Sequence, residues 1–383
     1  MSQTSSGYRD ISRRSWLALA ASAVTGCGGG GGSGGIAGLP GTGGTGIYAQ
    51  GTIAGFGSVI VNSVKYDDRL AQVQIDGVNA VSADLRLGMV AEVQGQLSAD
   101  PMLGTASTIA VWSIAQGAIT QVQAGQFTLM GMVIQPDGGT VYEGLSGTSA
   151  LAVGQRVSVW GLQSGADGVY WTATRMAISS NNAPSVVTGV VATTGQQRSV
   201  NGVSLSGNGV SALSSGQWVR VQGNLTGTLL QATHIQALGS ATGPLLQGEA
   251  EIEGVVTAVL AKTRFMLGNI EVDASSTSLA SAIASIATGA RLEVKGTWQG
   301  RVLKAAQMSV EDDDNLHKVE IEGSIQQFSS LADFIVRNQR CNASATLGLS
   351  SSTVGKLKVG VKVKIEGRKS GDAVLVTKLE LSS

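Results

Sequence analysis

The chain has 383 residues, with 26 basic and 26 acidic side chains, 54 glycines and an aromatic content of only 4%. Because the formal charges cancel, no overall field attracts nucleic acid or an anionic membrane. An apolar content of 43% excludes a chain that is disordered throughout. Abundant glycine with only five prolines favours many short strands over long helices.

The first 26 residues have the layout of an export signal. Arg9, Arg13 and Arg14 form a basic region that precedes the apolar residues 16–24. This apolar stretch is shorter than the roughly 20 residues that a membrane-spanning helix needs. We therefore expect residues 1–26 to be a signal peptide and not a membrane anchor.

The signal ends in Val24-Thr25-Gly26-Cys27, a sequence that resembles the bacterial lipobox. The resemblance implies cleavage before Cys27 and a diacylglycerol on its thiol. It also implies the outer membrane, on either face, because Gly28 stands where an aspartate would favour the inner membrane. Residues 12–17 resemble a twin-arginine export motif, so both that route and general secretion remain open. The alternative is a cleaved signal followed by a low-complexity tract in which Cys27 has no role.

Residues 28–46 are rich in glycine and form a predicted flexible tether after Cys27. A flexible chain of that length has a root-mean-square reach of roughly 24 Å. This reach would hold a folded body clear of the lipid headgroups. The tract also contains a GxSxG string and a GxGxxG string, but neither has the flanking strand and helix that a nucleophile elbow or a dinucleotide loop requires.

Five later stretches repeat one pattern of two glycines separated by alternating apolar residues. They read LRLGMVAEVQG, LAVGQRVSVWG, LSSGQWVRVQG, IATGARLEVKG and LKVGVKVKIEG, and their first glycines are Gly88, Gly154, Gly216, Gly289 and Gly360. The period-two alternation after each first glycine predicts a half-buried strand. The chain is therefore predicted to contain five copies of one module.

Each copy also opens with a strand, continues into a hairpin and closes with another strand. Asn201-Gly202 suits a type I′ turn. The matching turns are predicted at Asn62-Ser63, Gly131-Met132, Gly268-Asn269 and Arg337-Asn338. Closing each sheet would remove its exposed edges. We predict an all-β fold, a tandem array of about five small antiparallel OB-like β-barrel modules after the Gly-rich tether, with boundaries at 47–114, 115–182, 183–243, 244–314 and 315–383.

One segment, residues 276–289, is predicted to be helical because Leu279, Ile283 and Ile286 would share a face. It lies between the hairpin and the fourth strand, where an OB-fold often carries a helix. The recurring pattern over roughly residues 49–381 resembles the repeats of the domain-of-unknown-function 5666 family, which are often found in exported lipoproteins. The resemblance implies a fold and a location, and it implies no activity.

The chain has few candidate catalytic or metal-binding side chains. His234 and His317 form no metal-binding motif and are expected on the surface. Cys341 aligns with apolar positions of the other copies, which predicts a buried thiol, although a reactive one is the alternative. The acidic run 311–314 is expected to be a solvated linker because a calcium loop needs spaced oxygen ligands. No catalytic residue, metal or cofactor is predicted.

A basic stretch, residues 356–369, is predicted to form one strand of the last copy. Alternation would place Lys356, Lys358, Lys362 and Lys364 on one face. This face is the candidate site for an anionic ligand, either a polysaccharide or phospholipid headgroups. The alternative is a solvated face whose lysines prevent edge pairing. Nucleic acid is not expected because few aromatic side chains stand nearby for stacking.

The sequence therefore predicts a non-enzymatic, membrane-anchored envelope lipoprotein that acts as a binding or spacer module. The alternative is a protein that binds carbohydrate or another anionic polymer through the lysine face. The expected partners are the membrane, through the lipid on Cys27, and envelope polysaccharide or another envelope protein. An enzyme would require polar side chains from different copies to converge in space.

Overall fold

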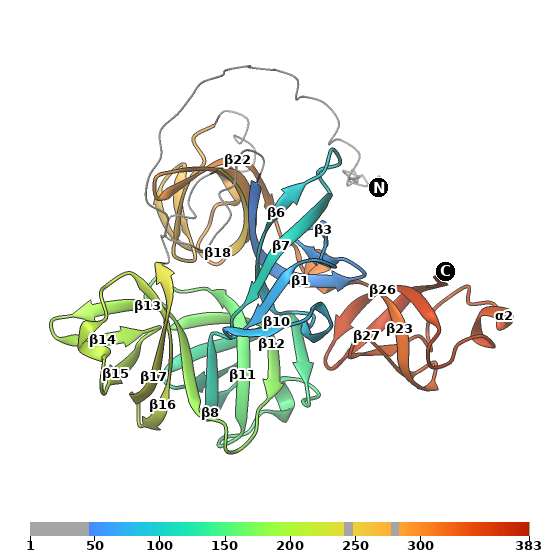
Figure 1. The fold of residues 1–383 in the computed structure, drawn as a ribbon, viewed down its shortest axis with the longest axis horizontal. Helices are drawn as coiled ribbons and strands as arrows, with labels where there is room; N and C mark the ends of the chain where they lie inside the picture. The colour runs from blue at the N-terminus through green and yellow to red at the C-terminus, as the bar shows by residue number, and fades with distance from the viewer. Residues whose placement is uncertain (1–45, 241–247, 277–282, 383) are drawn as a thin grey trace, which may run out of the picture. The chain divides into compact units, whose positions relative to one another are not determined.

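The computed structural model describes residues 46–240, 248–276 and 283–382, nearly all of whose regular structure is strand (Figure 1). Thr42–Ser383 forms one compact unit. The predicted signal peptide, Cys27 and the tether up to residue 45 lie outside the described residues.

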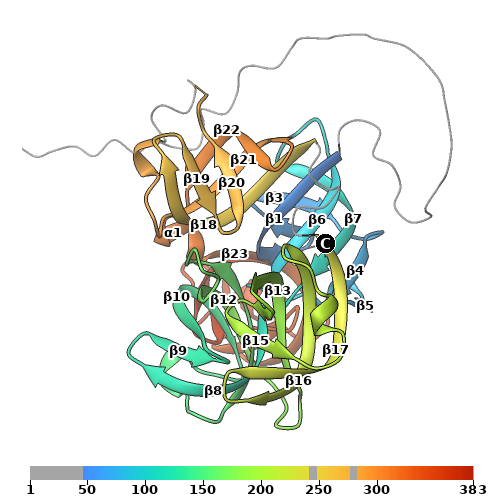
Figure 2. The ribbon, with the colours of Figure 1, turned by 90° about the vertical axis from the view of Figure 1, so that its left-hand side faces the viewer.

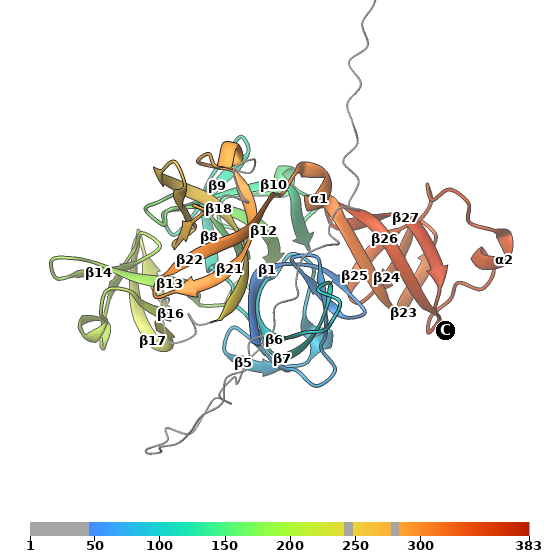
Figure 3. The same cartoon turned by 90° about the horizontal axis from the view of Figure 1, so that it is seen from above.

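The first module is a closed five-stranded barrel. Its strands are β1 (Gly46–Phe56), β2 (Val59–Val61), β3 (Val64–Asp67), β6 (Val90–Leu97) and β7 (Leu103–Val111). They pair in the order β1–β2–β3–β7–β6, and β6 returns to β1. Only the β3–β7 pair is parallel. Figure 3 shows this barrel end-on, with β1, β6 and β7 around its wall.

The same strand order recurs four times, which confirms the predicted tandem array of OB-like barrels. The second barrel has β8 (Ala115–Gln123), β9 (Gln126–Leu129), β10 (Met132–Glu143), β11 (Arg156–Gln163) and β12 (Tyr170–Ile178). The third has β13 (Ser185–Thr194), β14 (Gln197–Val200), β15 (Val203–Ser206), β16 (Gln217–Thr226) and β17 (Leu229–Ser240). In both barrels the third and fifth strands form the parallel pair.

The fourth barrel, drawn in Figure 2, has β18 (Glu249–Ala261), β19 (Arg264–Leu267), β20 (Ile270–Asp273), β21 (Arg291–Gln299) and β22 (Val302–Val310). The short helix α1 (Asp313–His317) leads into the fifth barrel. That barrel has β23 (Lys318–Ser330), β24 (Asp333–Val336), β25 (Gln339–Asn342), β26 (Lys362–Ser370) and β27 (Ala373–Leu381). Both close through the same parallel pair, β20–β22 and β25–β27.

The two repeated glycines answer two backbone requirements. The first glycine of each stretch is left-handed, for example Gly216 with φ +81°, and its N–H donates to the carbonyl oxygen of Val191 on the first strand of the module at 2.9 Å. The second glycine lies at a β-bulge against the last strand. A Cβ atom at Gly223 would lie 2.0 Å from the carbonyl oxygen of Gln231. The first glycine of the repeat is therefore required by backbone conformation, and the second by the lack of room for a side chain.

Replacing Gly223 with alanine should lower the free energy of unfolding by about 1–3 kcal/mol, because the new methyl group meets a neighbouring backbone. Asn224→Ala, an exposed change one residue away, should stay within about 0.5 kcal/mol of wild type. Denaturant titration of both variants measures the difference. Equal stabilities would contradict this account of the second glycine.

The hairpin at Asn201 and Gly202 has the predicted type I′ character, with positive φ at both residues. Both turn residues also have positive φ at Asn62-Ser63 and Arg337-Asn338, whereas in the fourth module only Gly268 does. In the second module the turn is Met130–Gly131, one residue before the predicted pair, because β10 begins with the buried side chain of Met132.

Residues 277–282 of the predicted helix lie outside the described ranges, and its described end contains a 3-10 turn, η5 (Ile283–Ser285). The corresponding place in three other modules is also a 3-10 turn: η1 (Ser82–Asp84), η2 (Thr148–Ala150) and η3 (Val210–Ala212). In the fifth module it is the one-turn helix α2 (Ser351–Val354).

The first module pairs with modules that are distant in sequence. Near its start, β1 runs parallel to β18, with residues 47–50 beside residues 249–252. At its end, β1 runs parallel to β23, where Phe56 lies beside Ile321. An extra hairpin, β4 (Gln72–Ile75) and β5 (Val78–Ala80), reaches the third module through an ion pair between Asp76 and Arg220 at 2.9 Å.

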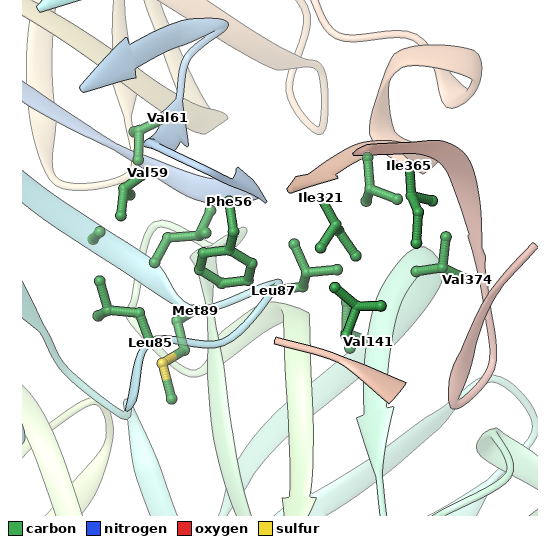
Figure 4. Close-up of a cluster of buried hydrophobic side chains, with 14 of the residues drawn as sticks. Phe56, Val59, Val61, Leu85, Leu87, Met89, Val141, Ile321, Ile365 and Val374 are labelled. Atoms are coloured by element: carbon green, nitrogen blue, oxygen red, sulfur yellow. The ribbon is translucent and has the colours of Figure 1, made fainter. Parts of the chain in front are cut away.

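Buried side chains form three clusters, two of which cross module boundaries. One combines the cores of the first and fifth modules and includes Val141 from the second (Figure 4). In it, Phe56 and Leu87 of the first module lie near Ile321 of the fifth. A second cluster combines the second and third modules, and a third fills the fourth module. The first and last modules therefore share a core.

Candidate functional site

A charged cluster lies where β18 of the fourth module runs beside β1 of the first. Ala250 and Ile252 fill the core of the fourth barrel, so the alternating Glu251 and Glu253 point away from it. These two glutamates are nevertheless only 5% and 7% exposed. Their burial means that each carboxylate needs partners from a neighbouring module.

Arg291 on β21 is the centre of this cluster, and its side chain is 9% exposed. Its Nη2 lies 2.5 Å from Oε1 of Glu253 and donates to Oγ1 of Thr52 at 3.1 Å. The backbone N–H of Thr52 donates to the second oxygen of Glu253 at 2.6 Å. A third contact, at 3.5 Å, joins Arg291 to Asp137 of the second module. One guanidinium thus links the first, second and fourth modules.

Asp137 is held by a tight Asp-Gly-Gly-Thr turn within β10. Its Oδ1 accepts the N–H of Gly139 at 2.9 Å, and its own N–H donates to Thr140 Oγ1 at 2.9 Å. A Cβ atom on Gly138 would lie 2.7 Å from the ring of His317. The small residues therefore let this turn approach α1 and present Asp137 to Arg291.

The fifth module contributes Lys369, from β26, which is 8% exposed. Burial, and then the charge of Arg291, lower the pKa of Lys369 to about 8. Burial alone would raise the pKa of Glu253, but the charge of Arg291 and the hydrogen bonds from Arg291 and Thr52 hold it below its ordinary value. The Glu253 carboxylate is therefore ionised at neutral pH and paired on both oxygens.

Glu251 belongs to a different arrangement on the same face. It hydrogen-bonds Glu293, and burial followed by the charge of Glu251 raises the pKa of Glu293 to about 9. Burial also raises the pKa of Glu251. The hydroxyl of Tyr66, a fully buried residue of the first module, has no hydrogen-bond partner among the described residues. Two acids therefore lie together on this face, and the base beside them is Lys295, opposite Glu251.

A second buried arginine joins the first two modules. Arg175 of β12 donates to the carbonyl oxygen of Leu87 at 3.0 Å and forms an ion pair with Glu143. Its guanidinium lies 5.8 Å from the ring centroid of Trp160. Burial lowers the pKa of Arg175 to about 10. The module boundaries are thus bridged by charged groups as well as by apolar contacts.

The predicted lysine face is not formed. β26 begins at Lys362, so Lys356 and Lys358 precede the strand, in the turn that ends at the left-handed Gly360. On the strand itself, Lys362 and Lys364 each form an ion pair with a glutamate of β23, Glu322 at 2.9 Å and Glu320 at 3.1 Å. The four lysines therefore do not share one strand face, and two of them are neutralised.

The aligned position of Cys341 is confirmed as a core position. Its counterparts are Tyr66, Ile134, Leu205 and Val272, all of which are buried. Burial raises the pKa of Cys341 to about 12, so the thiol stays protonated at neutral pH.

Of the two histidines, His234 is exposed as predicted, but His317 is half-buried against Gly138, so the surface prediction is wrong for it.

In the acidic run, Asp312 caps α1 by accepting the N–H of Asn315, and Asp314 pairs with Arg368. Across residues 46–240, 248–276 and 283–382, no group of three or more acidic, histidine or cysteine side chains is placed to hold a metal ion.

Sequence reasoning missed the junction around Arg291 because its members come from four copies. One local signal was present: the opening strands of the fourth and fifth copies read EAEIEG and KVEIEG. A charged side chain at every second position, facing away from the barrel core, indicates a charged outer face in these two copies.

None of the helices in the described part of the chain is long and apolar enough to span a bilayer.

Comparison with known proteins gives a family for two of the barrels. No curated protein matches the chain. The model of one family, described as Domain of unknown function (DUF5666), matches residues 116–177, from β8 to β12, and residues 253–309, from β18 to β22. The second and fourth modules are therefore each similar to the domain of unknown function DUF5666.

Proposed function

We propose that the chain is a non-enzymatic lipoprotein of the bacterial envelope, anchored to the outer membrane through a lipid on Cys27. Its five barrels act as a spacer or binding scaffold that the Gly-rich tether holds at the membrane surface. The anchor rests on the lipobox-like sequence that ends in Cys27. The observation that carries the scaffold role is the buried contact of Arg291 with Glu253, Thr52 and Asp137. A paired and buried network of this kind favours one arrangement of the modules, which suits a scaffold.

The state of Glu253 favours a structural role over catalysis for this residue. A general acid or base must reach a substrate and carry an exchangeable proton near neutral pH. Glu253 instead accepts hydrogen bonds on both oxygens from Arg291 and Thr52, and its pKa is lowered. Side chains from several modules meet here, as they would in an active site. The carboxylates of Glu253 and Asp137, however, contact Arg291.

The anchor is tested by intact-mass spectrometry of the mature protein extracted from membranes. We expect an N-terminus at Cys27 that carries the mass of a diacylglycerol. Cys27→Ala is the matched control, and it should leave the membrane fraction. An unmodified Cys27, or an N-terminus at Met1, would remove the anchor from the proposal.

The choice between spacer and ligand binder is made by thermal unfolding of residues 47–383 with peptidoglycan fragments, lipopolysaccharide, acidic polysaccharide, single-stranded DNA and calcium. A ligand at 100 times its dissociation constant stabilises the folded state by about 2.7 kcal/mol. A shift with an acidic polymer that Lys356→Gln and Lys358→Gln remove would favour the anionic-polymer alternative. No shift with any of them would favour a spacer or a protein partner.

A further inference from the structure

The contact between the first and fourth modules, which we call the β1–β18 seam, includes the parallel pairing of residues 47–50 with residues 249–252. The contacts of Thr52 with Glu253 and Arg291 lie at one end of this pairing. Asn62 bridges it, because its amide donates to the carbonyl oxygens of Gln50 at 3.1 Å and Glu251 at 3.0 Å. Each barrel is closed on its own, since β1 also pairs with β6 and β18 with β21. The seam can therefore open without breaking the strand pairing of either barrel.

A pair of acids lies at the seam. Glu251 on β18 and Glu293 on β21 are diagonal neighbours on the same face of two paired strands, since Glu253 lies opposite Glu293 and Lys295 opposite Glu251. Two carboxyl groups so placed can share a hydrogen bond only if a proton remains between them. The second oxygen of Glu251 has no hydrogen-bond partner in the described structure, although the residue is more than nine-tenths buried. The unpartnered hydroxyl of Tyr66 interacts electrostatically with the same pair from the first module. The unpartnered oxygen of Glu251 and the unpartnered hydroxyl of Tyr66 distinguish the acid pair from an ordinary network of ion pairs, in which every buried polar atom has a partner.

The groups around the pair do not neutralise a second negative charge. Glu253 lies directly opposite Glu293, and Lys295 lies opposite Glu251. Arg291 is already paired with Glu253. The other titratable groups that face the pair or the seam are Tyr66 on β3, Glu311 after β22, and Tyr48 with Glu92 on β1 and β6. Acids outnumber bases at this seam.

We propose that the β1–β18 seam is a proton-operated latch, closed while the Glu251–Glu293 pair holds its proton and loosened when the pair loses it. Loss of the proton leaves two like charges adjacent, one of them on the buried Glu251, where hydration is restricted. Separation of the two modules returns both carboxylates to water. This device goes beyond the proposed scaffold role and does not depend on the lipid anchor.

The direction of the response is set by linkage between proton binding and closure. Burial and the charge of Glu251 raise the pKa of Glu293 to about 9, above its ordinary value, so the closed seam binds a proton that the open seam releases. The closed state is then most stable at acidic pH, and this stability is lost as pH rises through about 9. The pKa of Glu92 is also raised by burial, to about 7, so its response must be separated from that of the pair.

The test is hydrogen exchange of the full chain between pH 6 and pH 10, followed by mass spectrometry and corrected for the intrinsic exchange rate. We expect protection of residues 47–50 and 249–252 to fall by at least about tenfold, the change that one unit of pKa difference produces. Protection of the β13–β16 pairing in the third module, residues 185–190, should stay level. Seam protection that does not change with pH would overturn the latch.

Variants assign the response to the acid pair. In Glu293→Gln the amide can donate to Glu251 at every pH, so seam protection should no longer depend on pH. Glu251→Gln makes the same change from the other side, and it keeps the test decisive if one variant does not fold. Glu271→Gln, at a half-exposed glutamate paired with Arg264 in the same barrel, should retain the wild-type response. A response that persists in both variants of the pair would overturn the proposal, with Glu92 as its source.

Discussion

Arg291→Met is expected to lower the free energy of unfolding by about 3–5 kcal/mol, because it leaves the carboxylate of Glu253 buried without its charged partner. The methionine side chain keeps most of the apolar stem of the arginine, so the loss reports chiefly on charge and hydrogen bonding. Asp137 and Thr52 lose a contact at the same time. Chemical denaturation of residues 47–383 measures the effect.

Two comparisons make the Arg291 result specific. The double variant Arg291→Met with Glu253→Leu should recover most of the loss, since removing both charges from a buried site is often neutral or stabilising. Arg340→Met is the matched surface control, because Arg340 is half-exposed and pairs with Asp333 and Asp372 in solvent. It should cost less than about 1 kcal/mol. Equal losses in Arg291→Met and Arg340→Met would mean that the junction does not hold the modules together.

Ile321→Ala in the fifth module is expected to destabilise the first module as well as its own. Ile321 is fully buried and lies beside Phe56 at the parallel contact of β1 and β23. Truncating a buried isoleucine typically costs about 2–5 kcal/mol through lost burial and the cavity that remains. Because the two modules share one apolar cluster, the loss should appear as reduced hydrogen-exchange protection in β2 as well as in β24.

The control for Ile321→Ala is Leu230→Ala, which empties a fully buried site in the core of the second and third modules. It should reduce protection there and leave β2 and β24 unchanged. If Ile321→Ala reduced protection in the fifth module alone, the first and last modules would fold independently, contrary to the shared cluster.

The repeating features of the fold could be predicted because each copy imposes the same local constraints. Gly216 requires a left-handed backbone, and Gly223 lies where a Cβ atom would meet Gln231, so both positions recur as glycine in every copy. Cys341 was placed correctly for a related reason: its position faces the barrel core in all five copies. These are properties of single strands and turns, and the local pattern determines them.

The error at the lysine face also has a local cause. The alternation of lysine and apolar residues through 356–364 predicts one strand. In the structure, Gly360 turns the chain before β26 begins. Its counterparts Gly88 and Gly154 likewise precede the strands β6 and β11. The repeat therefore contained the information that the strand starts only after its first glycine.

The junction around Arg291 could not be predicted because nothing in one copy determines which other copy it contacts. Thr52, Asp137 and Glu253 come from three modules, and the first module pairs with the fourth and fifth instead of only with its neighbour in sequence. Charge alternation in EAEIEG predicts an outer face that needs partners, but it does not identify them.

The core shared by the first and last modules also has a consequence for biosynthesis. About 200 residues separate Val111, where the first barrel ends, from Lys318, where the last begins. At about 5–20 residues per second, a ribosome needs on the order of 10–40 s to make them. Throughout that interval Phe56 lacks the partner that Ile321 of the fifth module supplies. The core of the amino-terminal barrel is therefore completed only when translation is almost finished.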